Sequence, residues 1–373
     1  MKGIAKMKNI KDYNMDELKE ELKNIGEKPF RAEQIFKWLY ETRVSTFDEM
    51  TNLSLELREK LKENYEIKQF KILKKQVATD GTKKYLFDVL DGNAIETVLM
   101  EYHHGFSLCV SSQIGCKMGC KFCASTGIPF VRNLSTGEII EQIMAVERDE
   151  NIRISNIVFM GIGEPLDNYD NVVKAIKIIN NPKGLNIGAR HISISTSGLV
   201  PKIYKLAEEN IQCTLSISLH ATTDEKRSEM MPVNNAYNIE ELLQACKDYI
   251  EKTHRRISFE YALAKENNDN LEDAKRLVKL LKGMLCHVNL IPIVDAVGNG
   301  LAFVEQIEHV AEEGGKVRTV PEQRQEERRP AEGRAALHLC RDLPRDRLRA
   351  FISGGILEGG QFAVQRVFQP RLF

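Results

Sequence analysis

From about residue 107 the chain alternates short apolar segments of strand length with longer segments of helical periodicity. The expected strands are "SLCVSSQ", "NIVFMG", "HISISTS", "CTLSISLHA", "RISFEYALA" and "CHVNLIPI". Segments such as "TGEIIEQIMAVERD" and "NIEELLQACKDYIEK" between them have the spacing of helices. Strands joined by connections of helix length favour a parallel α/β sheet or an incomplete barrel, in which chemistry occurs on the loops that follow the strands.

The first ninety residues predict a different organisation. "NMDELKEELKNIG" and "KPFRAEQIFKWLY" have helical spacing, and "KYLFDVLDGNAIETVLMEY" predicts a hairpin that turns at Asp91-Gly92. Residues 60–84 hold eight lysines against three acids. This basic stretch is either a contact for a phosphate backbone or a solvated lysine face. Because lysine plus arginine equals aspartate plus glutamate, 53 against 53, the net charge does not decide between them.

The last part of the chain differs in composition from everything before it. Residues 301–373 hold eleven arginines and a single lysine, Lys316, whereas lysine is the commoner base earlier. We interpret residues 294–373 as an atypical arginine-rich tail that arose from a shifted reading frame or a fusion. A natural flexible tail is the alternative.

The cysteines are expected to be reduced thiols. The chain shows no segment with the apolar length of a signal peptide or a membrane span, so we expect a cytoplasmic protein. Eight cysteines there favour metal or redox chemistry over structural disulfides. Cys213, Cys246 and Cys286 lie in strand or helix patterns, which is typical of buried small apolar residues.

Three cysteines form the sharpest motif. "GCKMGCKFC" places Cys116, Cys120 and Cys123 in the spacing C-x3-C-x2-C directly after the first expected strand. A structural zinc site would need a fourth ligand, from His103, His104 or a distant cysteine. An iron–sulfur cluster held by three cysteines instead leaves one iron open to a substrate or cofactor. This spacing is typical of radical S-adenosylmethionine enzymes.

Several strings, in order and spacing, resemble one family. "LCVSSQIGCKMGCKFCASTG", "FMGIGEPLDNYDNV", "HISISTSGLVP", "LSISLHA", "RSEMMPVN" and "HVNLIP" are similar to the dual-specificity ribosomal and transfer RNA adenine-C2 methyltransferases, the RlmN family. The resemblance implies a partial (β/α)6 TIM-like radical SAM barrel behind a small helical RNA-binding domain. We therefore expect an accessory domain with its hairpin over residues 1–95 and the radical SAM core over residues 96–293.

The resemblance also implies an activity. The family methylates C2 of adenine in 23S rRNA and in tRNA through a methyl-cysteine intermediate, using a 4Fe-4S cluster, S-adenosyl-L-methionine and a one-electron donor such as flavodoxin or ferredoxin. A monomer is expected. A sibling family that methylates adenine C8, and an RNA-binding remnant that bears a cluster without catalysis, remain the alternatives.

The implied site residues follow from the matching strings. Cys116, Cys120 and Cys123 would bind the cluster, Glu96 would take the C2 proton, and Cys109 would release the product by forming a disulfide with the methyl-carrying cysteine. The cofactor would be lined by Gly163, Glu164, Ser195, Ser218, Leu219 and His220.

The chain departs from the family near its end. Val294 stands where the family has a cofactor-contacting asparagine, and the family's A-C-G-Q-L string with the methyl-carrying cysteine is missing. The only later cysteine, Cys340, lies in the unrelated string "LHLCRDL". The expectation is a protein that holds the cluster but does not complete methyl transfer.

Overall fold

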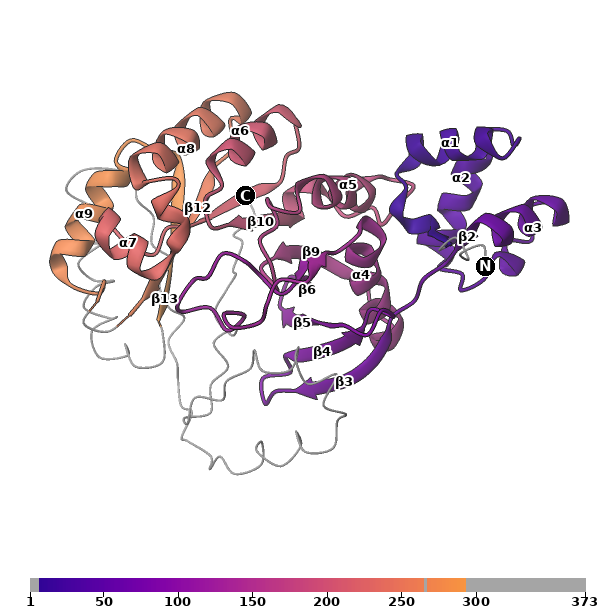
Figure 1. The fold of residues 1–373 in the computed structure, drawn as a ribbon, viewed down its shortest axis with the longest axis horizontal. Helices are drawn as coiled ribbons and strands as arrows, with labels where there is room; N and C mark the ends of the chain where they lie inside the picture. The colour runs from indigo at the N-terminus through magenta and orange to yellow at the C-terminus, as the bar shows by residue number, and fades with distance from the viewer. Residues whose placement is uncertain (1–6, 265–266, 293–373) are drawn as a thin grey trace, which may run out of the picture. The chain divides into compact units, whose positions relative to one another are not determined.

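The computed structural model describes residues 7–264 and 267–292 (Figure 1). The chain divides into two compact units. Of the described residues, the first comprises 7–115 and 130–193, and the second comprises 116–129, 194–264 and 267–292. Val294, Cys340 and the arginine-rich tail lie outside the described residues, so the expectations for them stay predictions.

The first unit begins with the predicted helices. They are α1 (Met15–Asn24), α2 (Arg31–Phe36), which continues as the π-helix η2 (Lys37–Thr42), and α3 (Leu55–Asn64). Two 3-10 turns, η1 (Ile10–Asp12) and η3 (Phe47–Glu49), and the short strands β1 (Lys8–Asn9) and β2 (Tyr65–Glu66) complete this segment. α1 starts at Asn14 because the Asn14 side chain accepts backbone hydrogen bonds from Asp16 and Glu17, and the Glu17 side chain returns one. Its buried face, Leu18 and Leu22, has the spacing expected from the sequence.

Five strands of a sheet follow this helical segment in the first unit. They are β3 (Lys71–Val77), β4 (Lys83–Asp88), β5 (Ala94–Tyr102), β6 (Gly105–Cys109) and β9 (Ile154–Phe159), in the order β9-β6-β5-β4-β3. The first four are antiparallel neighbours, and β9 joins β6 in parallel. The predicted hairpin is confirmed: β4 and β5 meet around Gly92, whose φ of 88° favours glycine.

Helices α4 (Thr136–Glu150) and α5 (Tyr169–Asn180) also belong to this unit. The Thr97 hydroxyl of β5 donates to Gln142 Oε1 of α4 at 2.8 Å, so α4 packs on the face of β5 that carries Thr97. Residues 113–114 and 132–133 pair as the short strands β7 (Gln113–Ile114) and β8 (Arg132–Asn133), which bracket the cysteine loop in the sequence.

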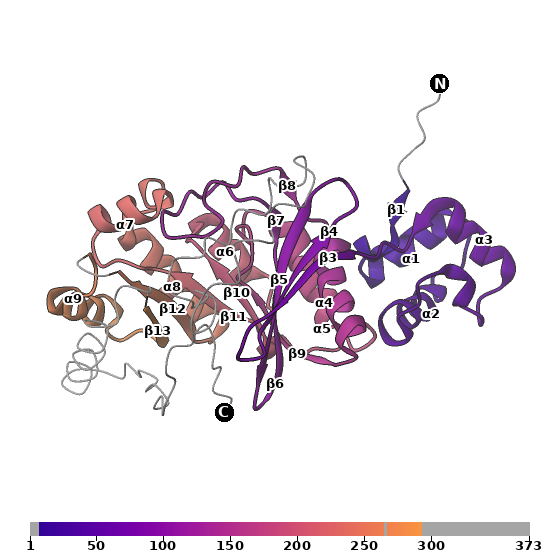
Figure 2. The ribbon, with the colours of Figure 1, turned by 90° about the horizontal axis from the view of Figure 1, so that it is seen from below.

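The second unit alternates strand and helix as predicted. β10 (Ile192–Thr196), β11 (Thr214–Ser218), β12 (Ile257–Leu263) and β13 (Cys286–Pro292) lie in the order β13-β12-β11-β10, with β11, β12 and β13 parallel. The helical elements between them are α6 (Val200–Glu208), α7 (Asp224–Met230), η5 (Pro232–Asn235), α8 (Ile239–Thr253) and α9 (Leu271–Leu281). Figure 2 shows them along the strands. The predicted α/β class is confirmed.

These strands have one apolar and one polar face. Ile217, Phe259 and Val288 are register partners on one face, whereas Ser218, Glu260 and Asn289 are partners on the other. The first set fills the core beneath the helices, since its members are at most 3% exposed. The second set supplies polar groups at the level where β11 ends. None of the described helices is long and apolar enough to cross a membrane.

Candidate active site

The cysteine loop of the second unit is a series of tight turns. The Cys123 N–H donates to the Cys120 carbonyl at 3.1 Å, and the Thr126 N–H donates to the Cys123 carbonyl at 2.9 Å. Gly119 adopts a φ of 68°, which glycine accepts without strain. Cys116 and Cys120 are half-buried and Cys123 is exposed, so all three can reach an incoming group.

The donor set of this loop fits a cluster with one open iron. It offers three soft thiol ligands within eight residues, and the Ser125 N–H already donates to Cys123 Sγ at 3.4 Å. Such N–H donation to sulfur is typical of cysteine-ligated clusters. Within residues 7–264 and 267–292, no three side chains of histidine, cysteine, aspartate or glutamate are already gathered in metal-binding geometry. The loop therefore supplies the three thiol ligands, and they would have to move closer together when a cluster binds.

The two histidines of the zinc alternative lie in the β5–β6 turn of the first unit. The His103 and His104 rings contact each other edge to face at 4.9 Å, and His104 stacks on Tyr102 at 5.3 Å. Burial lowers the pKa of His104, and the neighbouring His103 lowers it further. The two rings have an aromatic packing role in this turn.

Glu96 and Cys109 lie on one face of the first unit's sheet. Val98 is the register partner of Cys109, and Glu96 is two residues from Val98 on the same strand. Side chains two apart on a strand share a face, so Glu96 and Cys109 are diagonal neighbours, with β-carbons somewhat less than about 7–8 Å apart. Glu96 is half-buried and pairs with Lys84 at 3.0 Å. It is therefore not the solvated glutamate that alternation alone would suggest.

Cys109 itself is a protected thiol. Its side chain is 5% exposed, and burial raises the pKa of Cys109 to about 12. A thiol of that kind stays protonated and unreactive until its surroundings change. None of the seven described cysteines forms a disulfide.

The "GIGEP" loop follows β9 and requires its glycines. A β-carbon at Gly163, whose φ is 107°, would lie 2.6 Å from the β-carbon of Gln113. Gln113 also binds the loop directly, since its Oε1 accepts a hydrogen bond from the Glu164 N–H at 2.9 Å. The Glu164 carboxylate is buried and accepts from the Leu166 N–H at 3.0 Å. Sequence reasoning named Gly163 and Glu164 but missed Gln113, which lies 50 residues upstream of Gly163.

The second unit brings the "SLH" residues to the cysteine loop. Ser218 ends β11, Leu219 is buried, and Ser195 is half-buried on β10. The Phe122 ring of the cysteine loop contacts the His220 ring edge to face at 4.6 Å. The structure thus places His220 of the predicted cofactor lining against the cysteine loop.

His220 has a fixed protonation state. Its Nδ1 accepts from the Ala262 N–H at 2.9 Å, which leaves the ring proton on Nε2. Burial lowers the pKa of His220 to about 3, so the ring is neutral at physiological pH. Its φ of 56° is rare for a residue with a β-carbon and is held by the bond from the Asn268 amide to the His220 carbonyl at 2.6 Å.

Sequence reasoning also missed Glu260, which lies on the polar face of β12. Glu260 is 3% exposed, and its Oε1 accepts from Ser258 Oγ at 3.1 Å and from Asn289 Nδ2 at 3.4 Å. Among the described residues, Oε2 has no hydrogen-bond partner. Burial raises the pKa of Glu260 to about 7, against the opposing effect of these donors. The sequence signal that could have identified Glu260 is an acidic residue within the largely apolar string "SFEYAL".

Glu260 should make the stability of the protein depend on pH. Its carboxyl is protonated more readily in the folded state, so its contribution is fully present below about pH 4.5 and is lost as the pH rises through about 7. The difference between these values corresponds to about 3 kcal/mol. We expect Glu260→Gln to stabilise the protein at pH 8 and to have little effect near pH 4.5, as measured by urea unfolding. A gain that is equal at both pH values would contradict the assignment.

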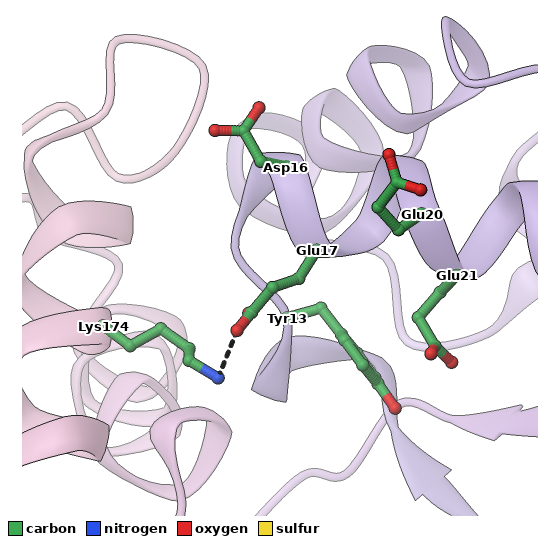
Figure 3. Close-up of a pocket in the computed structure, with 6 residues that line it drawn as sticks. All are labelled: Tyr13, Asp16, Glu17, Glu20, Glu21 and Lys174. Atoms are coloured by element: carbon green, nitrogen blue, oxygen red, sulfur yellow. Dashed lines mark ion pairs between the residues drawn. The ribbon is translucent and has the colours of Figure 1, made fainter.

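The basic stretch of residues 60–84 is largely paired. Six of its eight lysines form ion pairs with described carboxylates: Lys60 with Glu27, Lys62 with Asp48, Lys68 with Glu66, Lys75 with Asp149, Lys83 with Glu150 and Lys84 with Glu96. The helical segment also presents an acidic pocket, where Glu17 pairs with Lys174 at 2.7 Å and whose other lining residues are Tyr13, Asp16, Glu20 and Glu21 (Figure 3). Such a lining repels phosphate. The structure therefore favours the solvated, ion-paired interpretation of the lysines.

Comparisons with known proteins agree with this geometry. The model of the ribosomal RNA large subunit methyltransferase N-terminal domain matches residues 8–67, and that of the radical SAM superfamily matches residues 110–278. The crystal structure of a radical SAM methyltransferase from Sphaerobacter thermophilus is 39% identical, with a TM-score of 0.75 over 81% of this chain and 92% of that one. Fold and cysteine loop thus define a radical SAM methyltransferase.

The curated relatives are more specific. "Probable dual-specificity RNA methyltransferase RlmN" of Clostridium novyi (strain NT) is 56% identical over 288 residues, 77% of this chain and 84% of the relative. The protein of the same name from Thermoanaerobacter sp. (strain X514) is 55% identical over the same shares. The chain belongs to the RlmN family of radical SAM RNA methyltransferases. Membership implies a 4Fe-4S cluster and S-adenosylmethionine as cofactors and RNA as substrate, which confirms the expected enzyme class.

Proposed function

We propose that this chain is built to methylate C2 of an adenine in 23S rRNA and in tRNA, and that its cluster is held by Cys116, Cys120 and Cys123. The observation that carries this proposal is the cysteine loop, whose three thiols lie on consecutive turns and whose Phe122 packs on His220 of the "SLH" segment. Three protein ligands leave one iron for the amino and carboxylate groups of S-adenosylmethionine. When bound, these cofactors supply the radical chemistry that a non-nucleophilic carbon such as adenine C2 requires.

Further residues in each unit are proposed to contact the cofactor. Gly163 permits close backbone approach, and Glu164 is positioned by Gln113 to accept from the cofactor's amino group. Ser195, Ser218, Leu219 and His220 line the adenosyl part. Neutral His220 offers a single donor, Nε2–H, because Nδ1 is already used by Ala262.

Glu96 and Cys109 serve the final steps on RNA. Glu96 takes the C2 proton, which needs a carboxylate held in place, and Lys84 holds it at 3.0 Å. Cys109 lies on the same face; where a methyl-carrying cysteine is present, Cys109 would attack the sulfur that carries the RNA adduct. A disulfide would form as the C–S bond breaks, and the released carbon would take the electron pair and a proton to become the methyl group. The raised pKa of Cys109 keeps its thiol protonated in the buried site.

The chain as written does not complete the reaction. The methyl-carrying cysteine of A-C-G-Q-L is missing, and Val294 cannot donate a side-chain hydrogen bond to the cofactor. This tail favours a second candidate, a cluster-bearing RNA-binding protein without methyl transfer. Residues 1–95 act as the accessory domain and 96–293 as the core. The protein is a cytoplasmic monomer that takes single electrons from a flavodoxin- or ferredoxin-type donor.

Product analysis tests the regiochemistry. A chain whose residues 294–373 are replaced by the corresponding segment of the Clostridium novyi relative is incubated anaerobically with 23S rRNA and tRNA fragments, and digested nucleosides are analysed by mass spectrometry. We expect 2-methyladenosine in both RNAs. Formation of 8-methyladenosine would instead assign the chain to the sibling reaction.

A further inference from the structure

We propose that Arg227 is a positioning residue of the cofactor site: it fixes the carboxyl ends of β10 and β11 and places a positive charge near the cysteine loop. The inference rests on the proposed function, because it concerns the same cluster and cofactor. Arg227 lies in α7, at the start of the string "RSEMMPVN", which resembles the family but assigns this arginine no role.

The guanidinium of Arg227 is fully buried and connects α7 to the residues that follow β10 and to the end of β11. Its Nη2 donates to the Ser197 carbonyl at 2.7 Å, just beyond β10, and to the Ser218 carbonyl at 3.1 Å, where β11 ends. Its Nε donates to the Leu219 carbonyl at 3.2 Å. Ser218 and Leu219 are two of the proposed cofactor residues, so this one side chain sets their backbone.

The guanidinium of Arg227 is itself held in place by further hydrogen bonds. Its Nη1 donates to Asn234 Oδ1 at 2.9 Å, and the Asn234 amide donates to Asp224 Oδ1 at 3.0 Å and to Ser228 Oγ at 2.8 Å. At Gly198, whose φ is 106°, a β-carbon would lie 3.2 Å from Nη2. The backbone thus approaches the guanidinium as closely as glycine allows, which a flexible lysine could not reproduce.

The same segment contacts the cysteine loop. The Lys121 N–H, between the second and third cysteines, donates to the Met230 carbonyl at the end of α7 at 2.9 Å. A β-carbon at Gly119 would contact the Pro232 ring at 3.7 Å. The hydrogen bonds of Arg227 therefore connect the strand ends to the segment on which the cysteine loop rests.

The nearest carboxylate to Arg227 in its hydrogen-bond network, Asp224, is reached only through Asn234. Arg227 donates hydrogen bonds to three carbonyls and one amide oxygen, and among the described residues it forms no direct ion pair with a carboxylate. Burial lowers the pKa of Arg227 to about 10, while negative charge at Cys120, Asp224 and Cys246 has the opposite effect. A buried cation without a carboxylate is costly, and nearby thiolates and a cluster that gains an electron would offset that cost.

Two consequences follow. Because one-electron reduction by a flavodoxin-type donor adds one negative charge to the cluster, the charge of Arg227 raises the reduction potential. Because the planar guanidinium binds the carbonyls at the ends of two strands, it holds the backbone of the proposed S-adenosylmethionine site in place. The two effects can be measured separately, because the Arg227→Lys variant keeps the positive charge but loses the planar hydrogen-bonding group.

The test compares Arg227→Gln, Arg227→Lys and the exposed control Arg256→Gln in reconstituted full-length protein. The readouts are iron content, the midpoint potential from a titration followed by electron paramagnetic resonance, and the Kd for S-adenosylmethionine. Arg227→Gln should reduce the reduced-to-oxidised ratio at a fixed potential about tenfold, a shift of about 59 mV to lower potential, and should weaken cofactor binding. Arg227→Lys should keep the potential and weaken binding about tenfold, and Arg256→Gln should change neither.

The outcomes separate this inference from the proposed function. If the parent chain itself takes up no iron, the proposed function fails. If the parent chain takes up iron but both Arg227 variants match it in potential and Kd, only the role of Arg227 is overturned. If Arg227→Gln does not fold, as judged by circular dichroism, Arg227→Lys alone decides: an unchanged Kd overturns the proposal.

Discussion

Replacing Cys120 by serine should remove the iron–sulfur cluster and reduce reductive cleavage of S-adenosylmethionine at least about 100-fold. Serine keeps the size of the side chain but loses the soft thiolate that holds iron. Cys120 is half-buried in a loop whose turns are closed by backbone bonds, so the substitution should leave the fold intact. Iron and sulfide analysis after anaerobic reconstitution, and chromatography of the cleavage product 5′-deoxyadenosine, measure both effects.

A matched control separates ligand loss from general damage. Cys246→Ser changes a thiol that is 0% exposed on the buried side of α8, so it should lower stability and leave the iron content unchanged. Full iron content in Cys120→Ser would contradict the ligand assignment. A colourless parent protein with one bound zinc would contradict it as well, and would restore the zinc alternative.

Restoring the tail should turn methyl transfer on. The parent chain should give no methylated RNA, whereas the chimera with the Clostridium novyi segment in place of residues 294–373 should methylate RNA at a measurable rate. The physical reason is that adenine C2 accepts a carbon delivered from a methylated thiol, and the chain as written lacks the string that carries that thiol. Transfer of label from S-adenosylmethionine methyl groups to RNA measures the gain.

Two variants of the chimera serve as controls. Alanine in place of the cysteine of the A-C-G-Q-L string should return methyl transfer to zero. Glu96→Gln should lower it about 10²- to 10⁴-fold while cofactor cleavage continues, as expected for loss of a base. Equal methylation by the parent chain and the chimera would show that the tail is competent and would overturn the account of impairment.

The sequence predicted the α/β class well because buried parallel strands and amphipathic helices have strong periodicities. Strands over Cys286–Pro292 and Ile257–Leu263 lie where the apolar segments were identified. The edge strand β3 was not predicted, because its side chains are mostly exposed and its pattern is interrupted by a bulge between Ile72 and Lys74. The π-helical end of the second helix, over Lys37–Thr42, also has no signal in residue spacing.

The site was predicted less evenly. Cys116, Cys120 and Cys123 could be identified because their spacing is local. The face of Glu96 depends on the register of two hairpins, which places it diagonally to Cys109. Gln113, Arg227 and Glu260 escaped prediction because their roles arise from contacts over long sequence separations. The pairing of six lysines could not be read from composition, since their acids lie on other elements.

The central claim is that this chain holds a cluster which cleaves S-adenosylmethionine reductively. The most direct measurement is the amount of 5′-deoxyadenosine formed by the anaerobically reconstituted full-length chain with S-adenosylmethionine and a one-electron reductant. We predict that it forms with the parent chain and is lost in Cys120→Ser. A parent chain that carries a full complement of iron and sulfide and still forms no 5′-deoxyadenosine would contradict the claim.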